Sequence, residues 1–204
     1  MKMRRKEFIQ YLSSGILLLA VGRLPQAQAA PRRTLRFGVL TDTHYADRPT
    51  AGTRHYADSL QKVDEAIEAF NRAKVDFVIE LGDLKDMDAK GTPELTLRYL
   101  DSIEQRLRRF DGPLYHVLGN HDMDCITKEE FLAHPSNAGR ANGRAYYSFE
   151  AQGVRCIVLD ANFNADMTPY SRGNFDWRVA NIPTEQLDWL DEELKRHRRQ
   201  PTRS

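Results

Sequence analysis

Hydrophobic and polar residues follow one another along the chain in blocks that predict alternating strands and helices. Apolar runs at residues 35–40, 75–81 and 114–118 predict strands, and the second run shows the weak alternation of a strand covered on both faces. Between them, residues 58–72 and 93–109 carry apolar side chains at the three- and four-residue spacing of amphipathic helices. This order implies parallel strands joined by right-handed crossovers.

The pattern changes after the third strand. Residues 128–133 predict a short helix, and residues 145–149 and 154–159 predict a β-hairpin, so we expect the sheet to turn antiparallel there. Residues 162–181 form a long polar segment, of a length that usually serves function or is disordered, and a further helix begins at Thr184. The expected fold class is α/β, with one domain built on a mixed β-sheet with flanking helices.

The first 29 residues have the layout of an export signal. An apolar run at residues 16–21 is too short to span a bilayer, and Ala27-Gln28-Ala29 offers the small residues that a signal peptidase accepts. Basic residues precede the run, namely Lys2, Arg4, Arg5 and Lys6. The pair Arg4-Arg5 resembles a twin-arginine signal, although two residues instead of one separate it from Phe8.

We therefore expect residues 1–29 to be a signal peptide and residues 30–204 to be the exported domain, periplasmic or extracellular, without stable membrane association after cleavage. An uncleaved anchor is the alternative. Cleavage removes five basic residues and one acidic residue, which changes the formal net charge from +1 to about −3. An acidic domain lacks the electrostatic footprint of a nucleic-acid-binding protein. Of the two cysteines, Cys156 lies in an apolar run and is expected to be a buried free thiol.

Each of the first three predicted strands ends in a polar cluster. The clusters are Asp42-Thr43-His44, Gly82-Asp83-Leu84-Lys85-Asp86 and Gly119-Asn120-His121-Asp122. Because the carboxyl ends of parallel strands share one edge of the sheet, where ligands bind, we expect the clusters to converge. Their carboxylates, imidazoles and amide suit Mn, Fe or Zn. Asp83 is placed to bridge two ions, which can clamp a phosphoryl group and lower the pKa of a shared water.

Gly82 and Gly119 have a separate role in this pattern. Each stands between a predicted strand and the side chain that is aimed at the crevice, where glycine permits a sharp turn. We expect a β-branched residue at either position to misplace the following ligand.

The motifs Asp-x-His, Gly-Asp-x-x-Asp and Gly-Asn-His-Asp, in this order and each at a strand end, resemble the calcineurin-like metallophosphoesterase superfamily, which includes purple acid phosphatases and some nucleases. The resemblance extends from about residue 35 to about residue 194 and implies part of a four-layer α/β/β/α sandwich. Tyr45, the run Arg54-His55-Tyr56 and Ser59 resemble the subgroup of manganese-dependent ADP-ribose and CDP-alcohol diphosphatases.

The resemblance implies roles for the metal-binding residues. Asp42 and His44 would ligate the first metal, Asp83 would bridge, and Asn120 would ligate the second metal through its side-chain oxygen. The complete enzyme would hold two divalent ions, which are Mn, Fe or Zn, and metal-bound hydroxide would attack phosphorus in line.

The resemblance also implies catalytic residues. His121 would face the substrate phosphate and stabilise charge or protonate the leaving oxygen, with Asp86 orienting the imidazole. The substrate would be a small-molecule phosphate ester or a nucleoside-diphosphate conjugate. The loop at residues 173–177 would form part of a lid over the site, with Phe175 or Trp177 stacking on a base.

The superfamily supplies further histidine ligands from Gly-His and Gly-x-His segments later in the chain, and this sequence lacks them. The remaining histidines beyond His121 are His134 and His197, in different contexts. We therefore interpret the chain as C-terminally truncated. Two alternatives to a phosphoesterase stay open: an inactive or single-metal fragment, and an exported nuclease, which the acidic mature chain disfavours.

Structural roles compete with functional ones at several residues. Asp86 would serve equally well as the cap of a turn. His116 lies inside the third predicted strand, and we interpret it as a packing residue. Asp160 ends another strand, where turn or cap roles compete with a place in the crevice.

Overall fold

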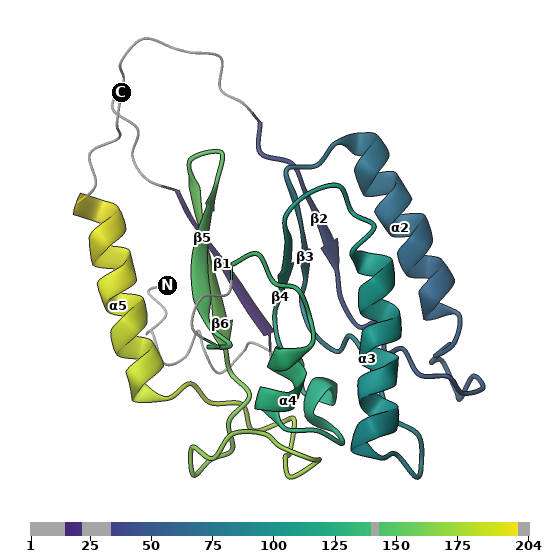
Figure 1. Cartoon of the computed structure of the whole chain (residues 1–204). Coiled ribbons are helices and arrows are strands. Elements are labelled where there is room, and N and C mark those ends of the chain that lie inside the picture. Colours follow the sequence, from purple (N-terminus) through teal and green to yellow (C-terminus); the bar gives the residue numbers. More distant parts are fainter. Residues whose placement is uncertain (1–14, 22–33, 140–142, 200–204) are drawn as a thin grey trace.

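The computed structural model contains a three-stranded parallel sheet (Figure 1). Strands β2 (Phe37–Leu40), β3 (Phe77–Glu80) and β4 (Leu114–His116) pair side by side in that order, so all three end at the same edge. These strands confirm the prediction of three strands at the first three apolar runs. The structure describes residues 15–21, 34–139 and 143–199.

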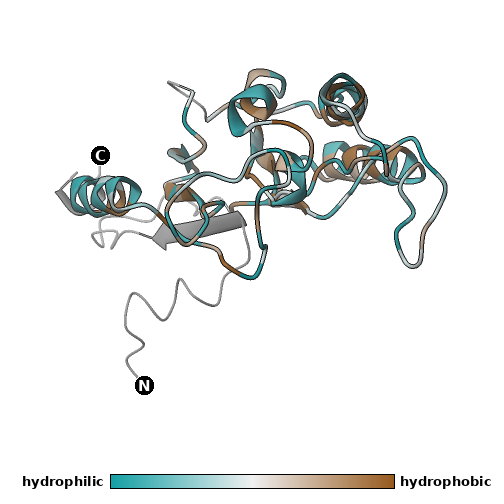
Figure 2. Ribbon diagram, turned by 90° about the horizontal axis from the view of Figure 1, so that it is seen from below, coloured by the Kyte–Doolittle hydropathy of each residue, from teal (hydrophilic) through white to brown (hydrophobic). Residues whose placement is uncertain are grey.

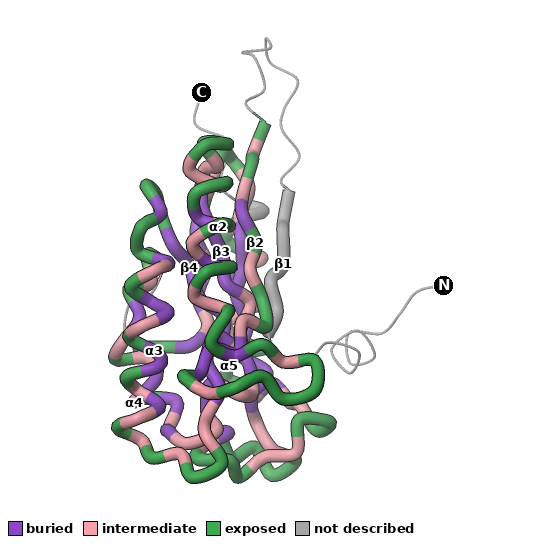
Figure 3. The backbone as a smooth tube through the Cα atoms, turned by 90° about the vertical axis from the view of Figure 1, so that its right-hand side faces the viewer, coloured by how far each residue is buried: buried purple, intermediate pink, exposed green. Residues whose placement is uncertain are grey.

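Two helices cover the outer face of this sheet. Helix α2 (Ser59–Ala73) ends at Lys74, which adopts a left-handed conformation. Helix α3 (Pro93–Leu107) begins with proline at its first position, and the Thr92 side chain accepts a hydrogen bond from the Leu95 N–H, as expected for a helix start. Both helices contribute buried side chains to the core cluster that also contains Val78 of β3. Their ribbons carry both hydrophobic and hydrophilic colours (Figure 2), and buried positions lie beside exposed ones along them (Figure 3).

The remaining strands form a sheet of their own. Strand β5 (Tyr147–Ala151) and strand β6 (Val154–Asp160) make the predicted hairpin, and β1 (Gly15–Val21) pairs antiparallel with the other side of β6. The predicted apolar run at residues 16–21 therefore lies in β1. The basic residues and the cleavage motif of the predicted signal lie outside the described residues.

The two sheets pack face to face through aromatic side chains. The Phe149 ring lies 5.2 Å from the Phe77 ring, nearly perpendicular to it, and also stacks on Tyr115. Cys156 is buried in the same layer as a free thiol, as expected from the sequence. Helix α5 (Thr184–Arg199) covers the outer face of the second sheet through Leu190 and its neighbours. The order of layers is therefore α/β/β/α, which confirms the fold class.

The segment after β4 lies against the edge where the parallel strands end. A short 3-10 helix, η1 (His121–Met123), leads to α4 (Lys128–Ala133), whose first turn is closed by reciprocal hydrogen bonds between Thr127 and Glu130. The Lys128 ammonium is buried and lies 2.6 Å from the Asp160 carboxylate at the end of β6. Among the described helices, none is both long enough and apolar enough to cross a membrane.

Candidate metal centre

The parallel ladder continues beyond the ends of β2 and β3 into the two turns that follow them. The Asp42 N–H donates to the Gly82 carbonyl at 3.1 Å, and the His44 N–H donates to the Asp83 carbonyl at 2.9 Å. Tyr45 and Lys85 then form a further parallel bridge. These bonds hold the first two predicted clusters side by side, as the strand-end argument requires.

The turns that follow β3 and β4 pack closely against each other, which explains why each contains a glycine. A Cβ atom on Gly119 would lie 2.2 Å from the Asp83 amide nitrogen, and one on Gly82 would lie 2.3 Å from the Gly119 nitrogen. Gly82 also has a φ of +100°, which side chains rarely adopt. The turns can therefore approach each other only because neither residue carries a side chain.

A buried carboxylate holds these two turns together. Asp122 is fully buried and accepts hydrogen bonds from the N–H groups of Gly119 at 2.8 Å, Leu84 at 3.0 Å and Asp83 at 3.1 Å. Nearby, the buried Lys85 ammonium donates to the His121 carbonyl at 2.5 Å. The positioning roles of Asp122 and Lys85 were not predicted, because nothing in the sequence distinguishes these residues from the other polar residues of their clusters.

Three of the predicted metal ligands converge. The Nε2 atom of His44 lies 3.7 Å from Asp42 Oδ1 and 3.7 Å from Asp83 Oδ2, and the ligand atoms of all three residues lie within 4.8 Å of one another. Two ligands that are each about 2.1 Å from one ion lie at most about 4.2 Å apart, so the two 3.7 Å separations fit a shared cation. An oxygen- and nitrogen-donor set of this kind suits a manganese-type ion.

Asn120, the fourth predicted ligand, stands between two residues that contact Asp83. The His121 N–H donates to Asp83 Oδ1 at 2.8 Å, and Gly119 packs against the Asp83 backbone. The backbone of Asn120 therefore lies beside the carboxylate that was predicted to bridge.

His121 lies next to this set, but its partners differ from the expected one. Its ring is edge-on to His44, with ring centroids 4.6 Å apart. Its Nδ1 atom lies 2.8 Å from Asp124 Oδ2 and 4.0 Å from Asp86 Oδ2, so Asp124 rather than Asp86 orients the ring. Asp86 instead lies 3.2 Å from Nδ1 of His44. The reason is that η1 carries Asp124 round to the side of its first residue, His121.

Arg54 completes the polar cluster and was not predicted as a site residue. Its guanidinium donates to Asp86 Oδ2 at 2.8 Å, and its other terminal nitrogen lies 3.3 Å from Nε2 of His121. The side chain is 40% exposed, so the cation is open to a ligand. Its place in an irregular loop, away from any strand end, explains why the strand-end pattern did not indicate it.

The charges of these groups are tuned by burial and by each other. Burial raises the pKa of Asp83 above its usual range. Burial acts in the same direction on Asp86, but the neighbouring His44 imidazole and a hydrogen bond from the Met87 N–H outweigh it and hold its pKa at about 2. Burial would lower the pKa of His121, and the Asp124 carboxylate overcomes this effect and raises it. His121 is thereby biased towards the protonated form that can donate a proton.

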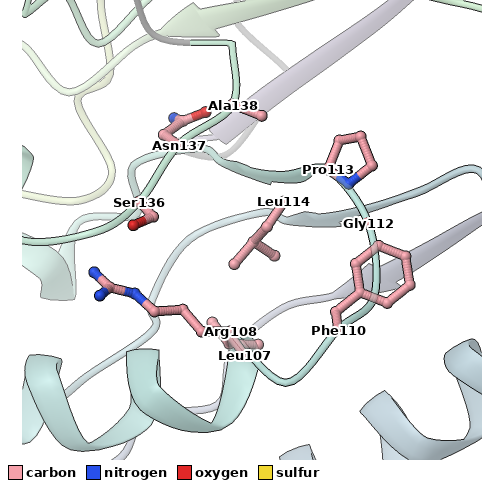
Figure 4. Close-up of a pocket in the computed structure, with 9 residues that line it drawn as sticks. All are labelled: Leu107, Arg108, Phe110, Gly112, Pro113, Leu114, Ser136, Asn137 and Ala138. Atoms are coloured by element: carbon pink, nitrogen blue, oxygen red, sulfur yellow. The ribbon is translucent and has the colours of Figure 1, made fainter.

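Two other features lie apart from this cluster. A cavity of about 490 Å³ is lined by residues around the start of β4 and the end of α3, at the opposite end of the strand from His121 (Figure 4). In residues 162–181, Phe175 stacks on the buried Tyr170 with centroids 4.7 Å apart, whereas Trp177 is 67% exposed. Of the two aromatic rings proposed to stack on a base, Trp177 is the more accessible.

Two curated relatives match most of the described sequence. The chain is 33% identical over 139 residues to the manganese-dependent ADP-ribose/CDP-alcohol diphosphatase of Arabidopsis thaliana, covering 65% of this chain and 44% of that protein. It is 30% identical over 167 residues to the protein of the same name from Oryza sativa subsp. japonica, covering 76% and 48%. The chain thus spans about half the length of these relatives.

A solved structure and a family profile complete the comparison. The crystal structure of a dimetal phosphatase from Danio rerio superposes with a TM-score of 0.58 over 80% of this chain and 65% of that one, at 19% identity, and so supports the fold. Residues 35–202 match the profile described as calcineurin-like phosphoesterase. The chain therefore belongs to the calcineurin-like phosphoesterase family.

Proposed function

We propose that the protein is a manganese-dependent phosphoesterase that hydrolyses the diphosphate bond of nucleoside-diphosphate conjugates such as ADP-ribose or a CDP-alcohol. The observation that carries the proposal is the convergence of Asp42, His44 and Asp83 at one edge of the parallel sheet, with His121 beside them. The names of the relatives, which specify manganese and these substrates, support the finer assignment.

The metal-binding part of the proposal rests on the donor set. Asp42, His44 and Asp83 would hold the first divalent ion, and Asp83 with Asn120 would contribute to a second. When bound, such ions polarise phosphoryl oxygens and make water a better nucleophile at neutral pH. Within the described part of the chain, the two clusters able to hold an ion share His44, so we expect one tightly bound ion.

The remaining residues would bind and protonate the diphosphate. Arg54 presents a planar, partly exposed cation that can donate two hydrogen bonds to phosphate oxygens, and its contacts to Asp86 and His121 fix its direction. His121, held by Asp124, would protonate the oxygen that leaves when the bond to phosphorus breaks. The named substrates of the relatives, rather than these contacts, favour a diphosphate over a monoester.

Manganese binding and product formation test this proposal. We expect the wild-type chain to bind Mn(II), measured by electron paramagnetic resonance of the free ion, and to release AMP from ADP-ribose and CMP from CDP-choline. Asp83→Asn should weaken Mn(II) binding at least about 100-fold, because loss of even an outer-shell partner costs 10–100-fold. Arg54→Ala should lower turnover of both diphosphates while leaving Mn(II) affinity within about twofold.

Asp88→Asn is the matched control. Asp88 lies in the same loop as Asp83 but accepts a hydrogen bond from Tyr99, away from the cluster. It should bind Mn(II) as the wild type does. Wild-type affinity in Asp83→Asn would contradict the metal site, and tight Mn(II) binding without release of AMP or CMP would contradict the substrate class.

A further inference from the structure

A second group of buried charges lies behind the candidate metal centre. Glu80 ends β3, His116 ends β4 and Glu104 lies on α3, and their exposed fractions are 0%, 4% and 1%. The imidazole stands between the two carboxylates. Its Nδ1 atom lies 3.5 Å from Glu80 Oε2 and its Nε2 atom lies 3.1 Å from Glu104 Oε2.

Packing alone does not account for these three residues. Burying ionisable groups costs several kcal/mol each before their attraction is counted, and apolar side chains of similar size would fill the same space. Neither contact of His116 meets strict hydrogen-bond geometry, although both are short enough for an ion pair. Burial lowers the pKa of His116, but the two glutamates outweigh burial and raise it to about 9, so the imidazole is charged at neutral pH.

The other carboxylate oxygen of Glu80 connects this group to the metal-bearing turn. Glu80 Oε1 accepts a hydrogen bond of 2.6 Å from the N–H of Gly82. Gly82 is the residue with the left-handed φ of +100°, and it directly precedes Asp83. The conformation that presents Asp83 is thus anchored through Glu80.

Glu104, on the other side of His116 from Glu80, is also held by hydrogen bonds. Glu104 Oε1 accepts hydrogen bonds from the Arg108 side chain at 3.0 Å and from the Ser136 N–H at 2.9 Å. The His116 carbonyl accepts one from the Tyr147 hydroxyl at 2.8 Å. Both ends being held, His116 cannot move away from Glu80 without breaking contacts in α3 and β5.

We propose that Glu104, His116 and Glu80 are positioning residues, which hold the Gly82 turn and thereby place Asp83 for the cation. The turn itself is independent of the metal, and only the consequence for cation binding rests on the proposed function. Burial raises the pKa of Glu80, and the neighbouring His116 acts in the opposite direction. Loss of the His116 charge would therefore favour protonation of Glu80. A protonated Glu80 is a weaker acceptor for the Gly82 N–H.

Amide exchange in the metal-free chain tests the anchoring directly. The measured quantity is the amide exchange rate of Gly82 divided by that of Val78. The Val78 N–H donates to the Pro113 carbonyl between the neighbouring chain segments, so a change in global stability affects both amides and cancels in the ratio. We expect this ratio to rise at least about 10-fold in Glu80→Leu, which removes the acceptor, and in His116→Gln, which removes the charge. Glu80→Gln keeps an acceptor oxygen and should restore most of the ratio.

Two further measurements keep the test decisive. Should Glu80→Leu fail to fold, Glu80→Gln should still move the Gly82 amide proton upfield, because a neutral acceptor replaces a carboxylate. Mn(II) affinity should fall about 10–100-fold in His116→Gln, as for other groups that orient a ligand. Glu193→Leu is the matched control, since it removes a buried carboxylate that pairs with Arg155 in the other sheet, and it should leave both quantities unchanged.

An unchanged Gly82 to Val78 ratio in His116→Gln and an unmoved Gly82 proton in Glu80→Gln would overturn the positioning role. So would an equal change in Glu193→Leu. A wild-type chain that binds no Mn(II) would instead refute the proposed function, while the amide data would still decide whether these residues hold the turn.

Discussion

Asp42, His44 and Asp83 all adopt left-handed backbone conformations, with φ of 55°, 44° and 57°. Such a conformation costs a non-glycine residue roughly 1–2 kcal/mol, so it persists only where neighbouring contacts enforce it. Here the ladder between the two turns supplies those contacts. These three are among seven described non-glycine residues with positive φ, and they are the three whose ligand atoms converge, as expected of a functional site.

Gly119 offers a test at this scale. In Gly119→Ala the new methyl group would overlap the Asp83 backbone, so the two turns must separate. We expect Mn(II) affinity to fall at least about 10-fold, as for other changes that misorient a ligand, measured by electron paramagnetic resonance. Gly153→Ala is the comparison, because Gly153 has a φ of +79° but no atom near its Cβ position. It should lose stability without losing affinity, and equal losses of affinity in both variants would contradict the role of close packing.

The residues that the sequence predicted at the site are those that follow strands. Asp42, His44, Asp83 and His121 could be placed together because parallel strands end at one edge. Asp124 was missed, although its three-residue spacing from His121 would have put both on one side of a 3-10 turn. Arg54 belongs to a run that resembles the diphosphatase subgroup, but its place beside His121 could not be predicted, since an irregular loop brings it to the cluster.

At the scale of elements, β3, β4 and α3 share the buried charges of Glu80, His116 and Glu104, and this sharing makes stability depend on pH. The pKa of His116 is raised from an ordinary 6.5 to about 9 in the folded chain. The folded state therefore binds the proton more tightly than the unfolded state does. The stabilisation is complete below about pH 6.5 and is lost as the pH rises through about 9.

Thermal unfolding between pH 6 and pH 9.5 measures this dependence. We expect the Tm of the wild type to fall by several degrees over that range relative to the Tm of His116→Gln, which lacks the titrating group. Parallel curves for the two proteins would show that folding does not raise the pKa of His116.

Most helices and strands and the parallel sheet could be predicted from periodicity, whereas the separation of the hairpin into a second sheet could not. The apolar runs place β2, β3 and β4 in the first sheet, and the hairpin of β5 and β6 is correct within two residues at each end. That the hairpin forms a separate sheet depends on the packing of Phe77 against Phe149, a contact between residues 72 positions apart. Local sequence patterns carry no information on such a contact.

At the scale of the whole molecule, β1 lies within the segment that we propose to be an export signal. Cleavage after Ala29 would remove β1 and leave β6 as an edge strand with unpaired backbone groups. We expect the protein recovered from the periplasm to begin at Ala30, which N-terminal sequencing would show. A recovered protein that still begins with residues 1–14 would contradict cleavage. The amides of β6 that bond to β1 should exchange faster in the processed form than in the precursor.

The ladder that runs past the strand ends into the first two turns of the candidate metal centre has a thermodynamic consequence. The candidate metal ligands are attached to backbone that the sheet already orders. Binding of an ion would therefore cost little additional conformational entropy. Dehydration of the incoming ion, rather than folding of a loop around it, then dominates the cost of uptake. After the ion dissociates, the strands would hold the ligand side chains in place for another ion.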